Sequence, residues 1–147
     1  MIALACDHGG FELMKKVKEH LSSIDLEYRD FGTYSDESCD YPTFAVPAAK
    51  AVAQGQCDRG IFICTTGIGI SITANKTPGI RAALCTSCFM AEMTRKHNDA
   101  NVLALGAAVV DSDLAIKIVD TFLNTDFSGE EKHKRRIKML SELDEGI

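Results

Sequence analysis

Short apolar runs alternate along the chain with longer segments whose apolar residues recur at a helical period. The run at 60–64 is apolar throughout, which is typical of a central strand buried on both faces of a parallel sheet. Units of strand, helix and strand build such a sheet. The alternation therefore predicts an α/β fold with about five parallel strands. We expect these strands at residues 2–6, 26–31, 60–64, 81–85 and 101–105.

The segments between these strands predict helices. The first helix has one apolar face, formed by Phe11, Met14, Val17 and Leu21. Further helices are expected at 42–53, 69–76 and about 87–97. Gly55 indicates the end of the helix at 42–53, and Ser112 is expected to cap the helix that follows the last strand.

A charged segment at about 129–145 predicts one more helix at the C-terminus. Ile137, Leu140 and Leu143 fall along one face of it. This stripe is too narrow for burial in a core, but it is wide enough to contact a partner chain. We therefore expect this helix to pack on a partner subunit.

Composition limits the classes of protein to be considered. A chain of 147 residues, 46% hydrophobic and 25% charged, fits a single domain spanning 1–147. No apolar stretch approaches the roughly 20 residues of a membrane span, and the first residues carry no secretion signal, so we expect a cytoplasmic protein. The formal net charge of −5 argues against nucleic-acid binding. An anionic ligand must then meet a local basic cluster.

Six cysteines lie mostly on the expected strands or at their ends, so we expect reduced thiols. The "CTSC" at Cys85 to Cys88 raises the alternative of a redox or zinc pair. Zinc requires a second pair at matching spacing, and the turn lacks the proline and tryptophan of thioredoxin-like sites. We therefore interpret both thiols as structural.

Reactive side chains follow the expected strands, where ligands bind in open α/β sheets. Asp7 and His8 follow the first strand, and residues 64–71 end the third strand and follow it. His97 and Asn98 come from the helix that precedes the fifth strand. Each histidine on its own also fits a capping or core role.

The third strand leads into the turn "CTTGIGIS". Gly67 and Gly69 allow the backbone to approach a ligand, and the amides that begin the next helix favour a phosphate or an enediolate. Neither the dinucleotide fingerprint nor the Walker pattern is present, so the turn alone also fits a structural loop. Cys64 is either a small buried apolar residue or a thiol activated by the helix N-terminus, with Thr66 able to hydrogen-bond it.

Five segments in order, "CDHGGF", "DYP", "CTTGIGISITANK", "GIRAALC" and "RKHNDANVLALG", resemble the type B ribose-5-phosphate isomerases. That family also contains allose-6-phosphate and galactose-6-phosphate isomerases. The resemblance implies a Rossmann-like three-layer α/β/α sandwich. It also implies a homodimer, or a dimer of dimers, whose active sites combine residues of both subunits and use no metal or cofactor.

The resemblance implies an aldose–ketose isomerisation through an enediolate. Cys64 matches the base, Thr66 the residue that supports it, and His97 the ring-opening residue. Some relatives place a glutamate where this chain has Ile70, and no carboxylate lies between Cys64 and Lys76. The positions matched to substrate binding are Asp7, Tyr41 and Asn98 at the sugar, His8 at the phosphate, and the amides of Gly67, Ile68, Gly69, Ile70 and Ser71 as an anion hole.

The basic run "EEKHKRRIKM" would ordinarily be a solvated helix face. Against the family it resembles a phosphate clamp, with Lys132 in place of a first arginine and Arg136 matching the second. A lysine retains the charge and loses the bidentate fork. Ala108 replaces another phosphate-contacting arginine, and Thr65 replaces a glycine beside the anion hole.

Ribose 5-phosphate and ribulose 5-phosphate are the expected substrate pair. The departures at Thr65, Ala108 and Lys132 leave open allose 6-phosphate or galactose 6-phosphate as the substrate. They also leave open a noncatalytic phosphosugar-binding subunit. Exchange of the sugar's C2 proton with solvent distinguishes an isomerase from such a binder.

Overall fold

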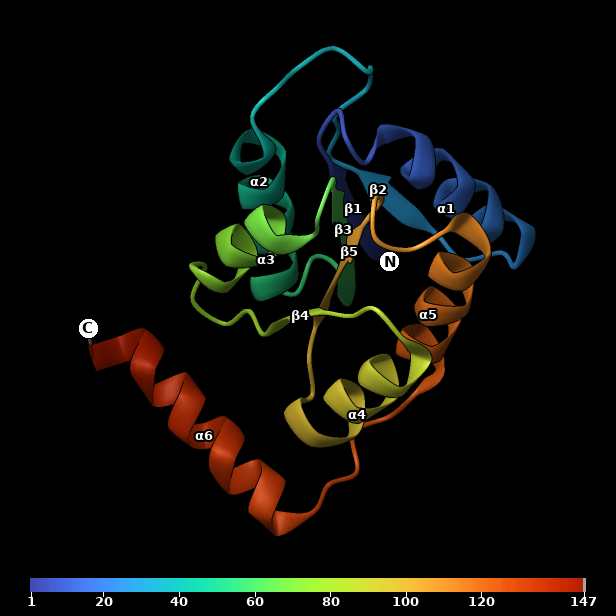
Figure 1. Cartoon of the computed structure of the whole chain (residues 1–147). Coiled ribbons are helices and arrows are strands. Elements are labelled where there is room, and N and C mark those ends of the chain that lie inside the picture. The colour runs from blue at the N-terminus through green and yellow to red at the C-terminus, as the bar shows by residue number, and fades with distance from the viewer. Residues whose placement is uncertain (147) are drawn as a thin grey trace.

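The computed structural model describes residues 1–146, and its five strands form one parallel sheet. The strands lie side by side in the order β2-β1-β3-β5-β4 (Figure 1). They are β1 (Ile2–Cys6), β2 (Tyr28–Asp30), β3 (Arg59–Cys64), β4 (Ala82–Leu84) and β5 (Val102–Gly106). The predicted set of about five parallel strands is confirmed, although β2 and β4 are shorter than expected.

Helices cover both faces of this sheet, so the predicted three-layer sandwich is confirmed (Figure 1). Helices α2 and α3 pack on one face, and α1, α4 and α5 pack on the other. The helices are α1 (Phe11–Ser23), α2 (Tyr41–Ala53), α3 (Ile68–Asn75), α4 (Cys88–Asn98), α5 (Ser112–Asn124) and α6 (Glu131–Gly146). No helix within residues 1–146 is both long enough and apolar enough to cross a membrane.

The central strands are buried along their whole length, because both of their faces are covered by helices. The layer under α2 is built largely from small side chains, among them Ala3, Ala5 and Ala104. Small residues let α2 approach the sheet closely. The opposite layer uses larger side chains, such as Leu4 and Leu103, and each such buried leucine stabilises the fold by about 2 kcal/mol.

The starts of α2, α3 and α5 differ from the sequence-based expectation, and α2 begins at Tyr41, one residue before its predicted start. The carboxylate of Asp111 accepts a hydrogen bond of 2.8 Å from the Leu114 amide, so Asp111 caps α5 and Ser112 is its first residue. Helix α3 begins at Ile68, one residue before the predicted start. The expected end of α2 at Gly55 is confirmed, since Gly55 has a φ of +77° just beyond the helix.

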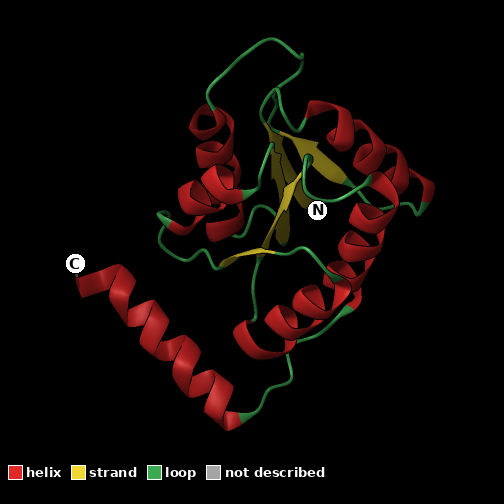
Figure 2. Cartoon of the chain, viewed as in Figure 1, coloured by secondary structure: helices red, strands yellow, loops and turns green. Residues whose placement is uncertain are grey.

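Helix α6 leaves the body of the molecule after a loop and runs away from the sheet as one uninterrupted helix (Figure 2). Its apolar side chains remain largely uncovered, with Met139, Leu140 and Leu143 all exposed. An amphipathic helix whose apolar stripe faces solvent gains little stability within its own chain. Contact of α6 with a partner subunit stays a prediction.

All six cysteines carry free thiols, as expected. Cys6, Cys57 and Cys85 are buried, and Cys39 and Cys88 are partly exposed. Burial raises the pKa of Cys6 to about 12 and that of Cys85 to about 11. These two thiols therefore stay protonated at neutral pH and pack as small apolar side chains.

The raised pKa values predict a loss of stability at alkaline pH. In the unfolded chain Cys6 and Cys85 ionise near the ordinary value of 9.0, whereas the folded chain keeps both protonated. Their contribution is complete below pH 9 and is lost as the pH rises toward the folded pKa values. The free energy of unfolding should fall by about 1.4 kcal/mol per pH unit for each thiol. Urea unfolding at several pH values between 8 and 11 measures this.

The double variant Cys6→Ala/Cys85→Ala should show a shallower pH dependence than the parent chain. Cys39→Ala is the matched control, because Cys39 lies in a loop and is partly exposed. It should retain the parent slope. Equal slopes for the parent and the double variant would contradict the assignment of the alkaline loss to these thiols.

Candidate active site

Three turns meet at the carboxyl edge of the sheet, after β1, β3 and β5 (Figure 1). The Ala108 amide donates a hydrogen bond of 2.9 Å to the Thr65 carbonyl, which ties the β5 turn to the β3 turn. The Thr65 hydroxyl fills the space that a side chain at Gly9 would need, so the β1 turn packs against the same residue. Thr65 and Ala108 are both exposed at this edge.

Cys64 is the last residue of β3, and its sulfur lies beneath the first turn of α3. The Gly67 amide donates a hydrogen bond of 3.1 Å to Cys64 Sγ. Gly67 has a φ of +78°, and a Cβ there would lie 2.9 Å from the Gly106 nitrogen, so only glycine fits this turn. Cys64 is 4% exposed and packs beside Phe62 and Ile70.

The amides of residues 67–71 do not all remain available to a ligand. The Gly67 amide bonds to Cys64 Sγ, the Ile68 amide donates to Thr66 Oγ1 at 3.2 Å, and the Ser71 amide donates to the Gly67 carbonyl at 3.2 Å. Within residues 1–146, Gly69 and Ile70 have no acceptor for their amides. The predicted anion hole thus reduces to these two donors at the N-terminus of α3.

Thr66 supports the start of α3 rather than the thiol. Its hydroxyl accepts the Ile68 amide, and the donor to Cys64 Sγ is the Gly67 amide. The sequence placed Thr66 next to the thiol, but the direction of its hydroxyl depends on the turn geometry. Ser71 is likewise engaged, because its hydroxyl donates a bond of 2.8 Å to the Ile68 carbonyl.

Tyr41 lies over the N-terminus of α3. It is the first residue of α2, and its ring sits directly above Gly69, where a Cβ would lie 2.7 Å from Tyr41 Cζ. Tyr41 remains 37% exposed. Tyr41 therefore forms one wall beside the two free amides.

Asp7 and His8 belong to the turn after β1. Asp7 is buried, and its Oδ1 accepts the amides of Gly9 and Gly10 at 2.9 and 3.2 Å, which fixes the turn. His8 is exposed, and its Nδ1 accepts the Cys39 amide at 3.2 Å. The neutral ring then carries its proton on Nε2, and this N–H can donate to an anion.

His97 and Asn98 lie at the opposite edge of the sheet, which corrects the sequence-based grouping with the strand ends. They end α4, and β5 begins four residues after Asn98 at Val102. Cys64 pairs with Gly106 at the far end of β5. Five residues of strand at about 3.3 Å each separate the two edges by roughly 15 Å. A helix between parallel strands runs back along the sheet, so its C-terminus meets the amino ends of the strands.

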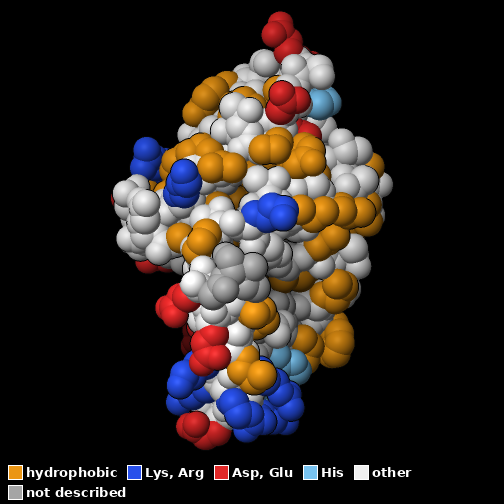
Figure 3. All heavy atoms as spheres, turned by 90° about the vertical axis from the view of Figure 1, so that its left-hand side faces the viewer, with side chains coloured by type: hydrophobic (Ala, Val, Ile, Leu, Met, Phe, Trp, Pro, Cys, Tyr) orange, Lys and Arg blue, Asp and Glu red, His pale blue; other side chains and the backbone are white. Residues whose placement is uncertain are grey.

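The phosphate-clamp candidates also lie toward this second edge. Lys132 and Arg136 are exposed on α6, four residues apart and therefore on one face of the helix. Lys132 Nζ lies 3.8 Å from Glu130 Oε2. Figure 3 shows lysine and arginine side chains together at the bottom of the molecule. The first half of α6 contains five basic residues, which are Lys132, Lys134, Arg135, Arg136 and Lys138.

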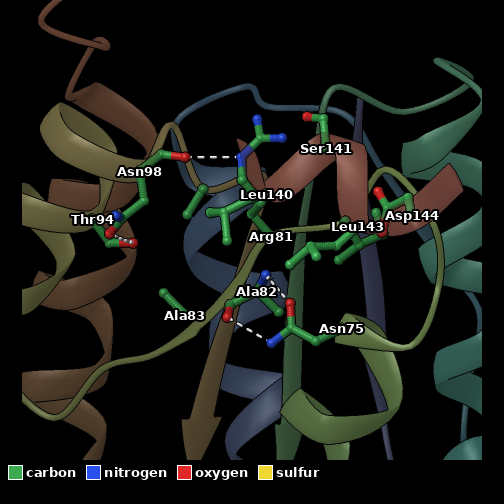
Figure 4. A pocket seen from close by; sticks show the side chains of 12 residues that line it. Asn75, Arg81, Ala82, Ala83, Thr94, Asn98, Leu140, Ser141, Leu143 and Asp144 are labelled. Carbon is green, nitrogen blue, oxygen red and sulfur yellow. Dashed lines mark hydrogen bonds between the residues drawn. The ribbon is translucent and has the colours of Figure 1, made fainter. Parts of the chain in front are cut away.

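A cavity of about 420 Å³ opens between α6 and the body of the molecule (Figure 4). Asn98 and Thr94 of α4 line one side, and Leu140 and Leu143 of α6 line another. The Asp144 carboxylate accepts a bond of 2.8 Å from the Gly79 amide, which holds the end of α6. Cys64 is not among the residues that line this cavity.

His133 was not selected from the sequence, although it lies in the basic run. Its ring stacks on that of His97, with centroids 4.4 Å apart, and its Nε2 lies 3.3 Å from Glu130 Oε2. The two histidines are far apart in the sequence, so no local pattern indicated their contact. Only the packing of α6 against α4 brings them together.

Comparisons with known proteins agree with the fold. A family model described as Ribose/Galactose Isomerase matches residues 2–140. The chain is 45% identical over 144 residues to ribose-5-phosphate isomerase B of Escherichia coli, which covers 98% of this chain and 96% of the relative.

Two solved structures are similar over nearly their whole length. Ribose-5-phosphate isomerase B of Clostridium thermocellum has a TM-score of 0.96 and 51% identity, covering 98% of this chain and 97% of that one. Ribose-5-phosphate isomerase B of Mycoplasma genitalium, solved with bound ribulose-5-phosphate, has a TM-score of 0.94 and 40% identity. That likeness covers 99% of this chain and 97% of the other.

The contacts at the carboxyl edge predict that two glycine substitutions there differ in effect. A Cβ at Gly106 would lie 2.5 Å from the backbone carbon and oxygen of Thr66, which cannot move without shifting the turn after Cys64. Gly106→Ala should therefore destabilise the protein by about 1–3 kcal/mol or more. Gly69→Ala meets only the exposed ring of Tyr41, which can swing into solvent, so its cost should stay below about 1 kcal/mol.

Urea unfolding of the two variants and the parent chain measures the difference. Neither glycine has a positive φ, so the two substitutions differ in steric crowding and in the helix propensity that alanine adds at position 69. Equal losses of stability in both variants would contradict the crowding inferred at Gly106.

Proposed function

The chain belongs to the ribose/galactose isomerase family, and from this premise we propose that it interconverts ribose 5-phosphate and ribulose 5-phosphate. One observation carries the chemistry: the Cys64 thiol accepts an amide hydrogen bond at the N-terminus of α3, next to the unpaired amides of Gly69 and Ile70. A base beside anion donors is what formation of an enediolate requires. Near-full-length similarity to relatives named for this reaction supports the choice of substrate.

Cys64 serves as the base in this proposal. Its thiolate removes the C2 proton of the open aldose, and the bonding electrons pass to the C1 carbonyl, giving an enediolate with its charge on O1. The thiol returns the proton to C1, and a proton moves from O2 to O1, which yields the ketose. No carboxylate lies between Cys64 and Lys76 to act instead.

The free amides of Gly69 and Ile70 supply the stabilising donors. They point from the N-terminus of α3, where the helix dipole favours negative charge. A single donor of this kind lowers a transition state by about 3–4 kcal/mol. Tyr41 borders the same space and Asp7 has one carboxylate oxygen outside the turn bonds, so both are placed to contact sugar hydroxyls.

The active site requires a second copy of the chain in this proposal. His97, assigned to ring opening, and Asn98 lie at the opposite edge of the sheet from Cys64, roughly 15 Å away along β5. One chain cannot present both edges to one pentose. A partner can supply His97 and Asn98, and the exposed apolar stripe of α6 is suited to that contact. We therefore propose a homodimer, or a dimer of dimers, with shared sites.

Phosphate recognition in this proposal uses few charged groups. His8 offers an Nε2–H, and Lys132 and Arg136 offer positive charge from α6. Ala108 is exposed at the carboxyl edge and adds no charge. The family description includes galactose, so a hexose 6-phosphate is the alternative substrate to be tested alongside ribose 5-phosphate.

The low exposure of Cys64 favours a second candidate function, a noncatalytic phosphosugar-binding subunit. At 4% exposure, the sulfur reaches a substrate carbon only if the turn of α3 admits the sugar. A binder would hold the phosphate and leave the C2 proton in place. Proton exchange therefore separates the two candidates.

Removing the thiol should abolish proton transfer. Cys64→Ala should lower exchange of the C2 proton of ribose 5-phosphate with deuterated solvent by at least about 10²-fold, because the base is gone. Binding of the sugar phosphate, measured by calorimetry, should change little. Cys57→Ala is the matched control, since Cys57 is buried in the same apolar layer and should keep full exchange.

Two outcomes would count against this assignment. Unchanged exchange in Cys64→Ala would place the base elsewhere in the site. Absence of exchange in the parent chain with ribose 5-phosphate and with both hexose 6-phosphates, while binding persists, would favour the noncatalytic binder.

A shared site predicts complementation between two inactive variants. Cys64→Ala and His97→Ala carry their defects at opposite edges, so a mixed dimer has one site with both defects and one intact site. Random mixing should restore about a quarter of the parent activity, because half of the dimers are mixed. The assay is ribulose 5-phosphate formation after subunit exchange, with mixed dimers verified by native mass spectrometry.

Cys64→Ala mixed with Asp7→Ala is the matched control. Both changes lie at the same edge, so every mixed site keeps one defect and activity should stay absent. Failure of the first mixture to recover activity, with mixed dimers present, would show that the site does not combine two chains in this way.

A further inference from the structure

Two histidine rings from different elements form a stacked pair at the second edge of the sheet. The rings of His97 and His133 lie 4.4 Å apart between centroids, with 17° between their planes. His97 is exposed at the end of α4, whereas His133 on α6 is 7% exposed. The His97 ring is therefore accessible, and the buried His133 ring covers one of its faces.

Burial and three of the four charged groups around His133 favour its neutral form, whereas Glu130 opposes them. His97 faces it from α4, and Glu130, Lys132 and Arg136 surround it from α6 and the residue before α6. Loss of solvent contact, followed by the positive charge of His97, lowers the pKa of His133. Its Nε2 lies 3.3 Å from Glu130 Oε2.

We propose that His133 is a positioning residue for ring opening, whose flat ring holds the imidazole of His97 in the orientation that its proton transfer requires. Ring opening breaks the bond between C1 and the ring oxygen of the furanose. A proton leaves the anomeric hydroxyl, and a proton is delivered to the ring oxygen. The proposal rests on the proposed function, which assigns this step to His97.

The two sugars differ in their need for this step. Ribose 5-phosphate closes to a furanose through its C4 hydroxyl. Ribulose 5-phosphate stays acyclic, because its carbonyl is at C2 and its C5 oxygen carries the phosphate. Removal of a C1 proton from the ketose therefore uses Cys64 and needs no ring opening. A defect in His97 orientation should slow the reaction of the aldose and spare proton exchange in the ketose.

Two substitutions distinguish the effect of the planar His133 ring from the effect of its volume. His133→Leu fills similar space without a planar face, and His133→Phe keeps the plane. His133→Leu should lower kcat/KM for ribose 5-phosphate by on the order of 10- to 100-fold. Exchange of the ribulose 5-phosphate C1 proton with deuterated solvent should stay within about twofold of the parent. His133→Phe should restore most of the lost turnover of the aldose.

His20→Ala is the matched control, because His20 pairs with Asp120 at 2.6 Å between α1 and α5 and belongs to neither the Cys64 turn nor the His97–His133 stack. It should leave both assays unchanged, and thermal melts verify that each variant is folded. If His133→Leu fails to fold, the same comparison is made between His133→Ala and His133→Phe.

Equal losses in the two His133 variants would overturn the proposal, and so would an equal loss with both sugars. Full turnover of the aldose by the folded His133→Leu or His133→Ala variant would also overturn it. Absence of exchange with either sugar in the parent chain would instead overturn the proposed function, which keeps the two failures distinguishable.

Discussion

Backbone-to-backbone contact between the turns after β3 and β5 is the constraint on which the carboxyl edge depends. Gly67 and Gly106 lie so close that neither position has room for a side chain. Their contact sets where α3 begins, and the start of α3 places an amide on the Cys64 sulfur. The same start leaves Gly69 and Ile70 with unpaired amides beside it. The arrangement of base and anion donors thus follows from glycine packing.

The direction of the parallel sheet imposes the second constraint. Each helix returns along the sheet, so residues after a strand and residues before the next strand lie at opposite edges. Cys64 belongs to the first set and His97 to the second. A chain that needs both groups at one sugar must therefore use two copies. Helix α6 fits the contact proposed above, since its apolar side chains stay exposed while its end is tied to Gly79.

The buried cysteines of this fold differ in the groups that surround their sulfur atoms. Cys6 and Cys85 lie among apolar side chains, where burial raises the pKa and keeps the thiol protonated. Cys64 is nearly as buried, but its sulfur accepts an amide hydrogen bond at a helix N-terminus. The amide hydrogen bond at the N-terminus of α3, rather than exposure, distinguishes the candidate base from the structural thiols.

The sequence by itself determined the α/β class, the five strands and the residues of the β3–α3 turn, because strand and helix periods and glycine positions are local properties. It also indicated Asp7, His8 and Cys64 at one edge, since each ends or follows a strand. Only the tertiary structure decided that His97 lies at the other edge and rests on His133. It also decided which amides stay unpaired. These features depend on contacts between segments distant in the chain, and no local pattern records such contacts.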